Sequence, residues 1–362
     1  MKLLKTKIIT IIGTRPEIIR LSRLIPKLDK KYQNILIHTG QNYDFELDQI
    51  FLKELNVRKP DYYLNARGSF AEQISKIIFK LEKIIKKEKP KKFLVLGDTN
   101  SSVGSIVAKR MGVKVYHMEA GNRCFSDKSP EEVNRKIIDH TSDVLLPYTS
   151  GSRKNLLMEG INSKDIIVTG NPITEVINFY QKKIINSKIV KKLKLNKNNF
   201  FVLTMHRQEN VDDYKTFEKF VFSFNKIVKK FNKPIVWPIH PRSHQMLKLN
   251  KIYLDPRLVI IKPLGFFDFV KLESDCLMTL TDSGTVQEES AILKKPCLII
   301  RDYTERPETI KARGAMLVGS NTKKILNAIN YYINRNIKIK IIKDYANKNV
   351  SSKVMKILKY KV

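Results

Sequence analysis

The chain has 362 residues, 42% of them hydrophobic, and is longer than one hydrophobic core normally supports. Its formal net charge is +33, but the basic residues are spread along the whole chain, whereas a nucleic-acid-binding module concentrates them. Apolar runs fall well short of the roughly 20 residues that a membrane helix needs. We therefore expect no nucleic-acid partner and no membrane insertion.

The first half alternates short apolar segments with amphipathic ones, which predicts a parallel sheet wrapped by helices. The predicted strands are 7–12, 34–38, 93–96, 114–118, 144–147 and 166–169. The predicted helices are 17–29, 44–55, 70–87, 101–110 and 131–140.

The same alternation restarts near residue 200 and predicts a second doubly wound α/β domain. Its predicted strands are 200–205, 235–238, 258–260, 276–280, 296–300 and 316–318. Its predicted helices are 214–230, 267–274 and 286–293. We place the boundary at a Gly-Asn-Pro break and expect domains at 1–171 and 172–345, with a C-terminal helix over 346–362 that packs back on the first domain.

The chain has three cysteines, which are Cys124, Cys276 and Cys297. They are odd in number and far apart, and two lie in strand-like contexts, which favours thiols in a reducing compartment over a disulfide framework. The N-terminus flows from a short apolar run into GTRPE without a cleavage site typical of a signal peptide. We expect a cytoplasmic protein.

Two turns that join a strand to a helix are typical of anion sites. Residues 13–17 read GTRPE, where Arg15 would lie beside free N–H groups at a helix start. Residues 282–285 read DSGT and offer a hydroxyl and bare amides in a similar place. Together these turns predict that a phosphorylated ligand is bound between two domains.

Carboxylates follow adjacent strands of the first half. Asp98 follows the strand 93–96, although capping of the next helix is an alternative role for it. His117 and Glu119 alternate to one face at the end of the next strand, and Glu131 opens a helix, where solvation is the alternative. Clustered carboxylates raise one another's pKa values, which suits proton transfer near neutral pH.

Histidine–arginine pairs follow two strands of the second half, in HRQEN at 206–210 and HPR at 240–242. A single histidine there would more often be structural, but two such strand ends favour an anion site. Further along, Ser283 is placed to cap a helix or bind phosphate, and Glu289 to accept hydrogen bonds from ribose hydroxyls. The motif around Arg306 repeats the Arg-Pro-Glu order of residues 15–17.

Motifs that the sequence lacks exclude several kinds of cofactor and metal chemistry. The sequence has no G-x-G-x-x-G, which removes the usual fingerprint of nicotinamide binding, and no P-loop. It has no H-E-x-x-H or C-x-x-C, and its histidines are dispersed, so we expect no bound metal.

Taken together, these motifs resemble the non-hydrolysing UDP-N-acetylglucosamine 2-epimerases, in order and over nearly the whole chain. The segments that carry the resemblance are 13–17, 39–41, 97–99, 117–121, 130–132, 206–210, 240–242, 282–289 and 304–308. The resemblance implies a glycosyltransferase-B-like fold, an active site in the interdomain cleft, a homodimer, and no redox cofactor or metal.

The resemblance also implies a reaction in which UDP is eliminated to leave a glycal-like intermediate and then added back with the C2 proton on the other face. It implies four catalytic residues, which are Asp98, Glu119, Glu131 and His206. It implies nine residues that bind the UDP-sugar, which are Arg15, Arg20, Arg123, Arg207, His240, Ser283, Gly284, Glu289 and Arg306.

Within the family, several segments resemble the branch that makes UDP-N-acetyl-L-fucosamine from UDP-2-acetamido-2,6-dideoxy-L-talose, which implies a role in capsule or O-antigen precursor supply. These segments are 13–22, 38–44, 119–125, 134–137, 265–268 and 282–285. The alternatives are interconversion of UDP-GlcNAc and UDP-ManNAc, glycosyl transfer on the same fold, a hydrolysing epimerase, and an inactive nucleotide-sugar binder.

Overall fold

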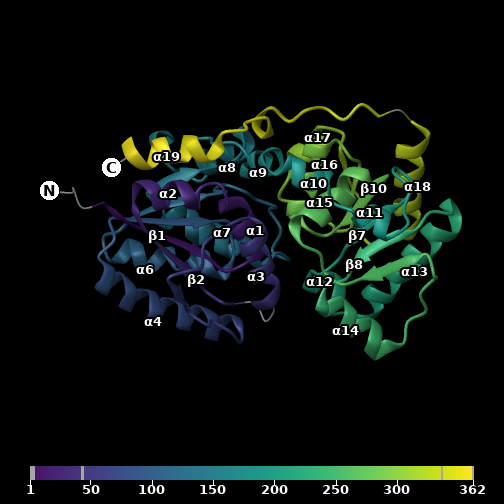
Figure 1. Cartoon of the computed structure of the whole chain (residues 1–362), viewed down its shortest axis with the longest axis horizontal. Helices are drawn as coiled ribbons and strands as arrows, with labels where there is room; N and C mark the ends of the chain where they lie inside the picture. Colours follow the sequence, from purple (N-terminus) through teal and green to yellow (C-terminus); the bar gives the residue numbers. More distant parts are fainter. Residues whose placement is uncertain (1–4, 42–44, 336, 361–362) are drawn as a thin grey trace. The chain divides into compact units, whose positions relative to one another are not determined.

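The computed structural model describes residues 5–41, 45–335 and 337–360. The chain forms two compact units, shown in Figure 1. Unit 1 comprises Met1–Phe179 and Lys343–Val362, and unit 2 comprises Tyr180–Ile342. Each unit has one six-stranded parallel sheet covered by helices, so the predicted fold class of two doubly wound α/β domains is confirmed.

The sheet of unit 1 has the strand order β3-β2-β1-β4-β5-β6. Its strands are β1 (Lys7–Ile12), β2 (Gln33–His38), β3 (Tyr62–Tyr63), β4 (Lys92–Leu96), β5 (Lys114–Met118) and β6 (Val144–Leu146). The order reverses between β1 and β4, and in such sheets ligands bind in the crevice outside the carboxyl ends at that switch point.

The helices of unit 1 connect these strands and cover both faces of the sheet. They are α1 (Arg15–Leu21), α2 (Ile25–Lys31), α3 (Phe45–Glu54), α4 (Phe70–Glu88), α5 (Asn100–Val103), α6 (Ser105–Arg110), α7 (Pro130–Thr141), α8 (Ser150–Met158), α9 (Pro172–Phe179) and α19 (Val350–Tyr360). Two 3₁₀ turns, η1 (Ser163–Asp165) and η2 (Lys343–Tyr345), complete the unit.

Alternation along the strands explains why both faces of this sheet are apolar. Ile9 and Ile11 of β1 pack with Phe93 and Val95 of β4 in a core that also contains Leu81 of α4. The intervening residues of β1 are also buried, so they face the opposite helical layer. A strand buried on both faces reads as a nearly continuous hydrophobic run, as KIITII does.

The sheet of unit 2 has the order β12-β11-β10-β7-β8-β9, which repeats the topology of the first sheet within the second unit. Its strands are β7 (Phe201–Thr204), β8 (Ile235–Pro238), β9 (Leu258–Ile261), β10 (Met278–Thr281), β11 (Cys297–Ile299) and β12 (Ala315–Leu317). The switch point therefore lies between β7 and β10.

The helices of unit 2 form two layers. They are α10 (Gln181–Ile185), α11 (Ile189–Lys192), α12 (Gln208–Val211), α13 (Tyr214–Phe231), α14 (Pro241–Asn250), α15 (Phe266–Asp275), α16 (Gly284–Leu293), α17 (Pro307–Lys311) and α18 (Thr322–Asn334). Phe201 and Leu203 of β7 pack in the core beneath α13 and α18, which lie side by side (Figure 1). Phe200 and Val202 point the other way, into the core beneath α11 and α15.

The boundaries between the units differ from those expected from the sequence. The chain leaves unit 1 after Phe179 rather than after residue 171, because α9 packs on α1 and α19. It returns at Lys343 rather than at 346, and α19 lies beside α2 and α9 within unit 1 (Figure 1).

Some predicted elements also differ. The helix predicted over 17–29 is two helices, which break at residues 22–24 just before Pro26 in the first turn of α2. The predicted strand 166–169 forms only one isolated bridge, between Ile166 and Leu145. Of the described residues, none belongs to a helix that is both long and apolar enough to cross a membrane.

Candidate functional site

The motifs identified from the sequence lie at the two switch points. In unit 1, the turns after β1 and β4 are adjacent at the carboxyl edge, and the loop after β5 follows. In unit 2, the turns after β7 and β10 occupy the equivalent edge. We call the first set, with Asp98, Glu119 and Glu131, the carboxylate site, and the second, with His206, His240 and Ser283, the anion site.

The turn after β1 is tied to the turn after β4 by a buried carboxylate. Glu17 accepts hydrogen bonds from the N–H groups of Gly13 and Thr14, at 2.8 Å for Thr14, and from Thr99 Oγ1 at 2.5 Å. A Cβ atom at Gly13 would lie 2.0 Å from Ser101 Oγ, so only glycine allows the two turns to approach this closely. Burial, opposed by these hydrogen bonds, raises the pKa of Glu17 to about 7. Arg15 begins α1 beside this turn and is half-buried.

Asp98 is held by an arginine of α7. Its Oδ2 accepts from Arg135 Nε at 2.8 Å and Nη2 at 2.7 Å, and its side chain remains 26% exposed. The N-cap of α5 is Thr99, so Asp98 does not cap that helix as the alternative prediction had it. A carboxylate fixed by a fork of two donors and still open to solvent is well placed to contact a ligand.

Glu119 forms a buried ion pair with Arg20 of α1, and its Oε1 accepts from Asn122 Nδ2 at 3.3 Å. Its backbone is left-handed, with φ of 70°. The strand alternation that predicted one face for His117 and Glu119 therefore ends at Met118. Glu119 nevertheless lies beside the turn after β4, since a Cβ atom on Gly97 would be 3.6 Å from its Oε2.

Glu131 and Glu132 begin α7 and have different environments. Glu132 is buried, pairs with Arg135 at 2.7 Å and accepts from the N–H groups of Cys124 and Phe125. It is therefore not a solvated surface residue. Glu131 is half-buried and accepts from Ser129 Oγ at 2.9 Å. It lies one helical turn before Arg135, on the side of α7 that reaches Asp98.

Arg123, which the resemblance assigns to substrate binding, is surrounded by protein acceptors. Its Nη2 lies 2.8 Å from Asp139 and 2.6 Å from Glu159, and its Nη1 donates to the Asn122 carbonyl at 2.8 Å. Its side chain is completely buried. These contacts differ from the expected role, because the protein itself already engages the guanidinium group that a ligand would need.

In unit 2, Asp282 joins the turns after β7 and β10. Its Oδ2 accepts from the N–H groups of His206 and Arg207 at 2.9 Å and from Asn210 Nδ2 at 3.2 Å. Its Oδ1 lies 3.2 Å from His206 Nδ1. Asp282 is fully buried whereas the His206 side chain is 35% exposed, so the buried carboxylate orients a histidine that solvent or a ligand can reach.

His240 and Ser283 lie close to the ends of helices. The rings of His206 and His240 have centroids 5.5 Å apart, and His240 caps α14 by accepting from the Arg242 N–H. Ser283 is the N-cap residue of α16, but its hydroxyl does not cap that helix. The half-buried hydroxyl and the first amides of α16 therefore suit an anion.

Gly284 and Arg306 meet beside Glu305. A Cβ atom on Gly284 would lie 2.6 Å from Glu305 Oε1 and 3.6 Å from Arg306 Nη2. Arg306 is buried and forms an ion pair with Glu288 of α16, and Arg207 Nη2 lies 4.0 Å from Glu305. Arg207 and Arg306, both predicted to bind the UDP-sugar, thus belong to a network with acidic side chains at the carboxyl edge of the second sheet.

Glu289, predicted to contact ribose, is 3% exposed and lies next to Glu273 of α15. Burial raises the pKa of Glu273 well above its ordinary value, and the charge and hydrogen bond of Glu289 raise it further. Two carboxyl groups in contact share a proton more readily than they both ionise.

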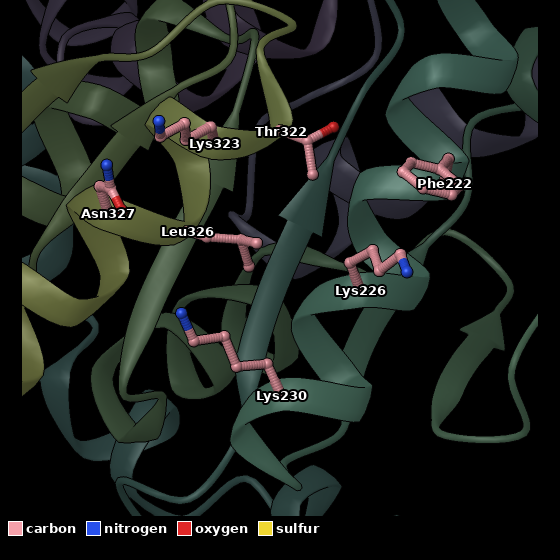
Figure 2. Close-up of a pocket in the computed structure, with 7 residues that line it drawn as sticks. All are labelled: Phe222, Lys226, Lys230, Thr322, Lys323, Leu326 and Asn327. Carbon is pink, nitrogen blue, oxygen red and sulfur yellow. The ribbon is translucent and has the colours of Figure 1, made fainter.

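A cavity of about 340 Å³ lies between α13 and α18, on the helical layer of unit 2 (Figure 2). Leu326 and Phe222 line it, and Lys226, Lys230 and Lys323 surround it. None of the residues predicted for catalysis or binding lines this cavity. It is therefore distinct from both the carboxylate site and the anion site.

Several residues of these sites were not predicted to contribute. The sequence indicated Glu17 only as part of a helix start and gave no role to Asp139 or Asp282. For Glu17, the available signal was a capping-box pattern, in which Thr14 is followed three residues later by a glutamate. Residues 42–44, within the matched segment 38–44, lie outside the described residues.

Comparisons with known proteins identify relatives that match most of the chain. The profile of the family UDP-N-acetylglucosamine 2-epimerase matches residues 26–359. The UDP-N-acetylglucosamine 2-epimerase of Methanococcus maripaludis is 42% identical over 340 residues, which cover 91% of this chain and 92% of that protein. The UDP-2,3-diacetamido-2,3-dideoxy-D-glucuronate 2-epimerase of Pseudomonas aeruginosa is 32% identical and covers 92% and 94%.

A solved structure is similar to this chain over nearly its whole length. The UDP-GlcNAc 2-epimerase of Methanocaldococcus jannaschii, in complex with UDP-GlcNAc and UDP, superposes with a TM-score of 0.92 at 37% identity, covering 98% of this chain and 100% of that chain. The fold and these relatives therefore define an isomerase with a glycosyltransferase-B-like fold. The chain belongs to the UDP-N-acetylglucosamine 2-epimerase family.

Proposed function

We propose that the protein inverts C2 of a UDP-2-acetamido sugar without net hydrolysis. The observation that supports this best is the carboxylate site, where Glu119 lies beside the turn that carries Asp98 and each carboxylate is held by its own arginine. A pair of oriented carboxylates can take a proton from one face of C2 and return one to the other.

In the proposed reaction, one carboxylate takes the C2 proton while the C1–O bond breaks and its electron pair leaves with UDP. A C1=C2 double bond forms, as in a glycal. UDP then adds back to C1 while a second carboxylate, on the other side of the sugar ring, delivers a proton to the opposite face of C2. We assign the proton transfers to Asp98, Glu119 and Glu131.

The anion site suits the departing diphosphate. We assign to His206 the stabilisation of its developing charge, supported by the contact of Asp282 with the ring and with the backbone of its loop. The binding residues proposed for UDP are Arg15, Arg207, His240, Ser283, Gly284, Glu289 and Arg306. Arg20 acts by orienting Glu119 rather than by binding UDP.

For the sugar, we favour UDP-2-acetamido-2,6-dideoxy-L-talose, giving UDP-N-acetyl-L-fucosamine. Support comes from the segment 119–125, in which Asn122 contacts Glu119 and Phe125 is largely exposed next to the carboxylate site. The M. maripaludis relative, named for UDP-N-acetylglucosamine, makes interconversion of UDP-GlcNAc and UDP-ManNAc the alternative. The resemblance also supports a homodimer, which sedimentation would measure.

Proton exchange tests the proposal. We expect incubation in D₂O to place deuterium at C2 of one substrate from a panel of UDP-GlcNAc, UDP-ManNAc and the 6-deoxy-L-talo sugar, as followed by NMR. Accumulation of free UDP would instead indicate a hydrolysing enzyme, and no deuterium in any member of the panel would disprove the proposed reaction.

The Glu119→Gln variant tests the assignment of one residue. We expect the exchange rate to fall by about 10²-fold or more, the usual contribution of a positioned acid or base. UDP affinity, measured by calorimetry, should not change because the anion site is intact. The matched control is Glu72→Gln at an exposed position of α4, which should leave both values unchanged. Undiminished exchange in the Glu119 variant would remove this residue from the mechanism.

A further inference from the structure

Directly beneath the carboxylate site, unit 1 contains a buried cluster of charges that the proposed reaction does not use. It comprises His117 of β5, Asp139 of α7, Arg123 and Glu159. The side chains of the first three are at most 1% exposed, and that of Glu159 is 24% exposed. Burying charges is costly unless each is paired, so a cluster retained here calls for an explanation.

The hydrogen bonds of His117 specify its protonation state. Its Nε2 lies 3.0 Å from the carbonyl oxygen of Gly97, and its Nδ1 lies 2.8 Å from Asp139 Oδ1. A carbonyl and a carboxylate only accept hydrogen bonds, so both ring nitrogens must donate. A neutral ring has one N–H, whereas an imidazolium has two.

Asp139 connects the same ring to the loop that carries Glu119. Its carboxylate accepts from the Gly121 N–H, at 3.1 Å from Oδ2, and pairs with Arg123 Nη2 at 2.8 Å. Both residues follow Glu119 closely in the chain, and Glu119 itself is left-handed. An unfavourable backbone conformation persists only when the surrounding contacts enforce it, and these contacts do so.

His117 and Asp139 therefore contact every segment that carries a proposed catalytic carboxylate. His117 contacts the residue before Asp98, Asp139 contacts the loop just after Glu119, and Asp139 is itself part of the helix that carries Glu131 in its first turn. We propose that His117, held as an imidazolium by Asp139 and the Gly97 carbonyl, is a positioning residue that fixes the three carboxylates of the active site. This inference rests on the proposed function.

The charges around the ring are consistent with that state. Asp139 from α7 faces Nδ1, Arg123 from the loop pairs with the other oxygen of Asp139, and Glu159 after α8 pairs with Arg123. With His117 as an imidazolium, the cluster contains two cations and two carboxylates, so its charges balance. The exposed His140 of α7 lies 3.4 Å from Glu159. Burial raises the pKa of Asp139, but His117 and Arg123 outweigh it and lower the pKa overall.

The first test reads the ring directly and needs no substrate. We expect the ¹⁵N spectrum of histidine-labelled enzyme at pH 7 to show two protonated nitrogens for His117, assigned through the backbone resonances of that residue. A neutral ring at pH 7 would overturn the proposal. Because the unmodified enzyme is used, this measurement stands even if a variant fails to fold.

The second test uses Asp139→Asn, which keeps the shape of the side chain and removes its charge. The new amide can donate to Nδ1, so we expect His117 to become the neutral Nε2–H tautomer. Misplaced carboxylates should lower kcat for C2 exchange by about tenfold to hundredfold. KM for the UDP-sugar and the Kd for UDP should change less than about twofold, since the anion site of unit 2 is unaltered.

Asp143→Asn is the matched control. Like Asp139, Asp143 is an aspartate that accepts from a backbone N–H, in this case that of Val115 at 2.9 Å, at the opposite end of β5. It should leave exchange unchanged. An Asp139→Asn enzyme with unaltered kcat would overturn the positioning role, whereas absence of exchange in the unmodified enzyme would count against the proposed function alone.

Discussion

Glu17 combines the roles of helix cap and turn connector within a fully buried environment. As the third residue of α1 it completes a capping box with Thr14, and the same carboxylate reaches Thr99 in the turn after β4. Burial raises its pKa to about 7, and the nearby charge of Asp98 contributes to that rise. Ionisation of Glu17 therefore occurs near neutral pH in the folded protein.

This raised pKa predicts a pH-dependent stability. An unfolded glutamate, with an ordinary pKa of 4.5, ionises before the folded one, so the native state binds the extra proton between pH 4.5 and about 7. Stability should fall as pH rises through that window and then level off. In Glu17→Gln the fall should disappear, as measured by guanidinium midpoints from pH 5 to 8.

Glu72 provides the control for this comparison. It completes the equivalent capping box of α4 with Ser69, but it is exposed and those hydrogen bonds lower its pKa. Both its folded and unfolded forms are ionised above pH 5, so Glu72→Gln should keep the pH profile of the unmodified protein. Parallel profiles for all three proteins would contradict the buried state of Glu17.

At the residue scale, sequence reasoning located side chains that follow strands but not their partners. Asp98, Glu119, His206 and Ser283 were predictable because parallel strands bring their carboxyl ends to one edge. The contact of Glu17 with Thr99 spans 82 residues and that of His206 with Asp282 spans 76, and no local pattern encodes such pairs. For the same reason, the burial of Arg123 between two acids could not be foreseen.

At the element scale, apolar periodicity predicted the long strands and the strongly amphipathic helices such as α4 and α13. It missed β3, which has only two residues, and α8, whose Gly151 and serines weaken helix propensity. It also missed α18, which contains several asparagines and β-branched residues. Tertiary packing stabilises these elements more than their own sequence does.

A buried carboxylate contributes to the attachment of α19 to unit 1. Glu175 of α9 accepts from the N–H of Ser351 at 2.7 Å and from the hydroxyl of the same residue at 2.5 Å, and Lys27 of α2 lies 3.6 Å away. Ser351 is in the first turn of α19, where N–H groups have no partner within the helix. A negative charge at this end also complements the helix dipole.

We expect Glu175→Ala to lower the free energy of unfolding by about 1–3 kcal/mol, because it leaves the buried Ser351 N–H and hydroxyl without acceptors. Urea unfolding followed by circular dichroism measures this change. Glu82→Ala removes an exposed carboxylate that pairs with Lys86 and should have a much smaller effect. Equal effects of both substitutions would show that α19 is not fastened at Glu175.

At the scale of the whole molecule, the net charge of +33 predicts a dependence on salt. Like charges destabilise a compact state, and the Debye length falls from about 14 Å to about 4 Å between 50 and 500 mM salt. We expect the thermal unfolding midpoint to rise by several degrees over that range. An equal osmolality of glucose serves as the control, and a midpoint indifferent to sodium chloride would contradict the expectation.

The overall architecture was predictable because two α/β alternations separated by a break specify two parallel sheets. The exact residue at which each unit ends was not predictable, because α9 comes after the expected break in the chain and yet packs on α1 of unit 1. The shared strand order of the two sheets, with equivalent switch points, emerges only from the pairing of strands that are distant in the chain.

Unit 2 is one uninterrupted stretch of chain, whereas unit 1 is assembled from both termini. A stop codon after Ile342 would therefore leave unit 2 whole and remove α19 from unit 1. Proteolytic removal of α19 would likewise leave α2 and α9 without the helix that packs on them.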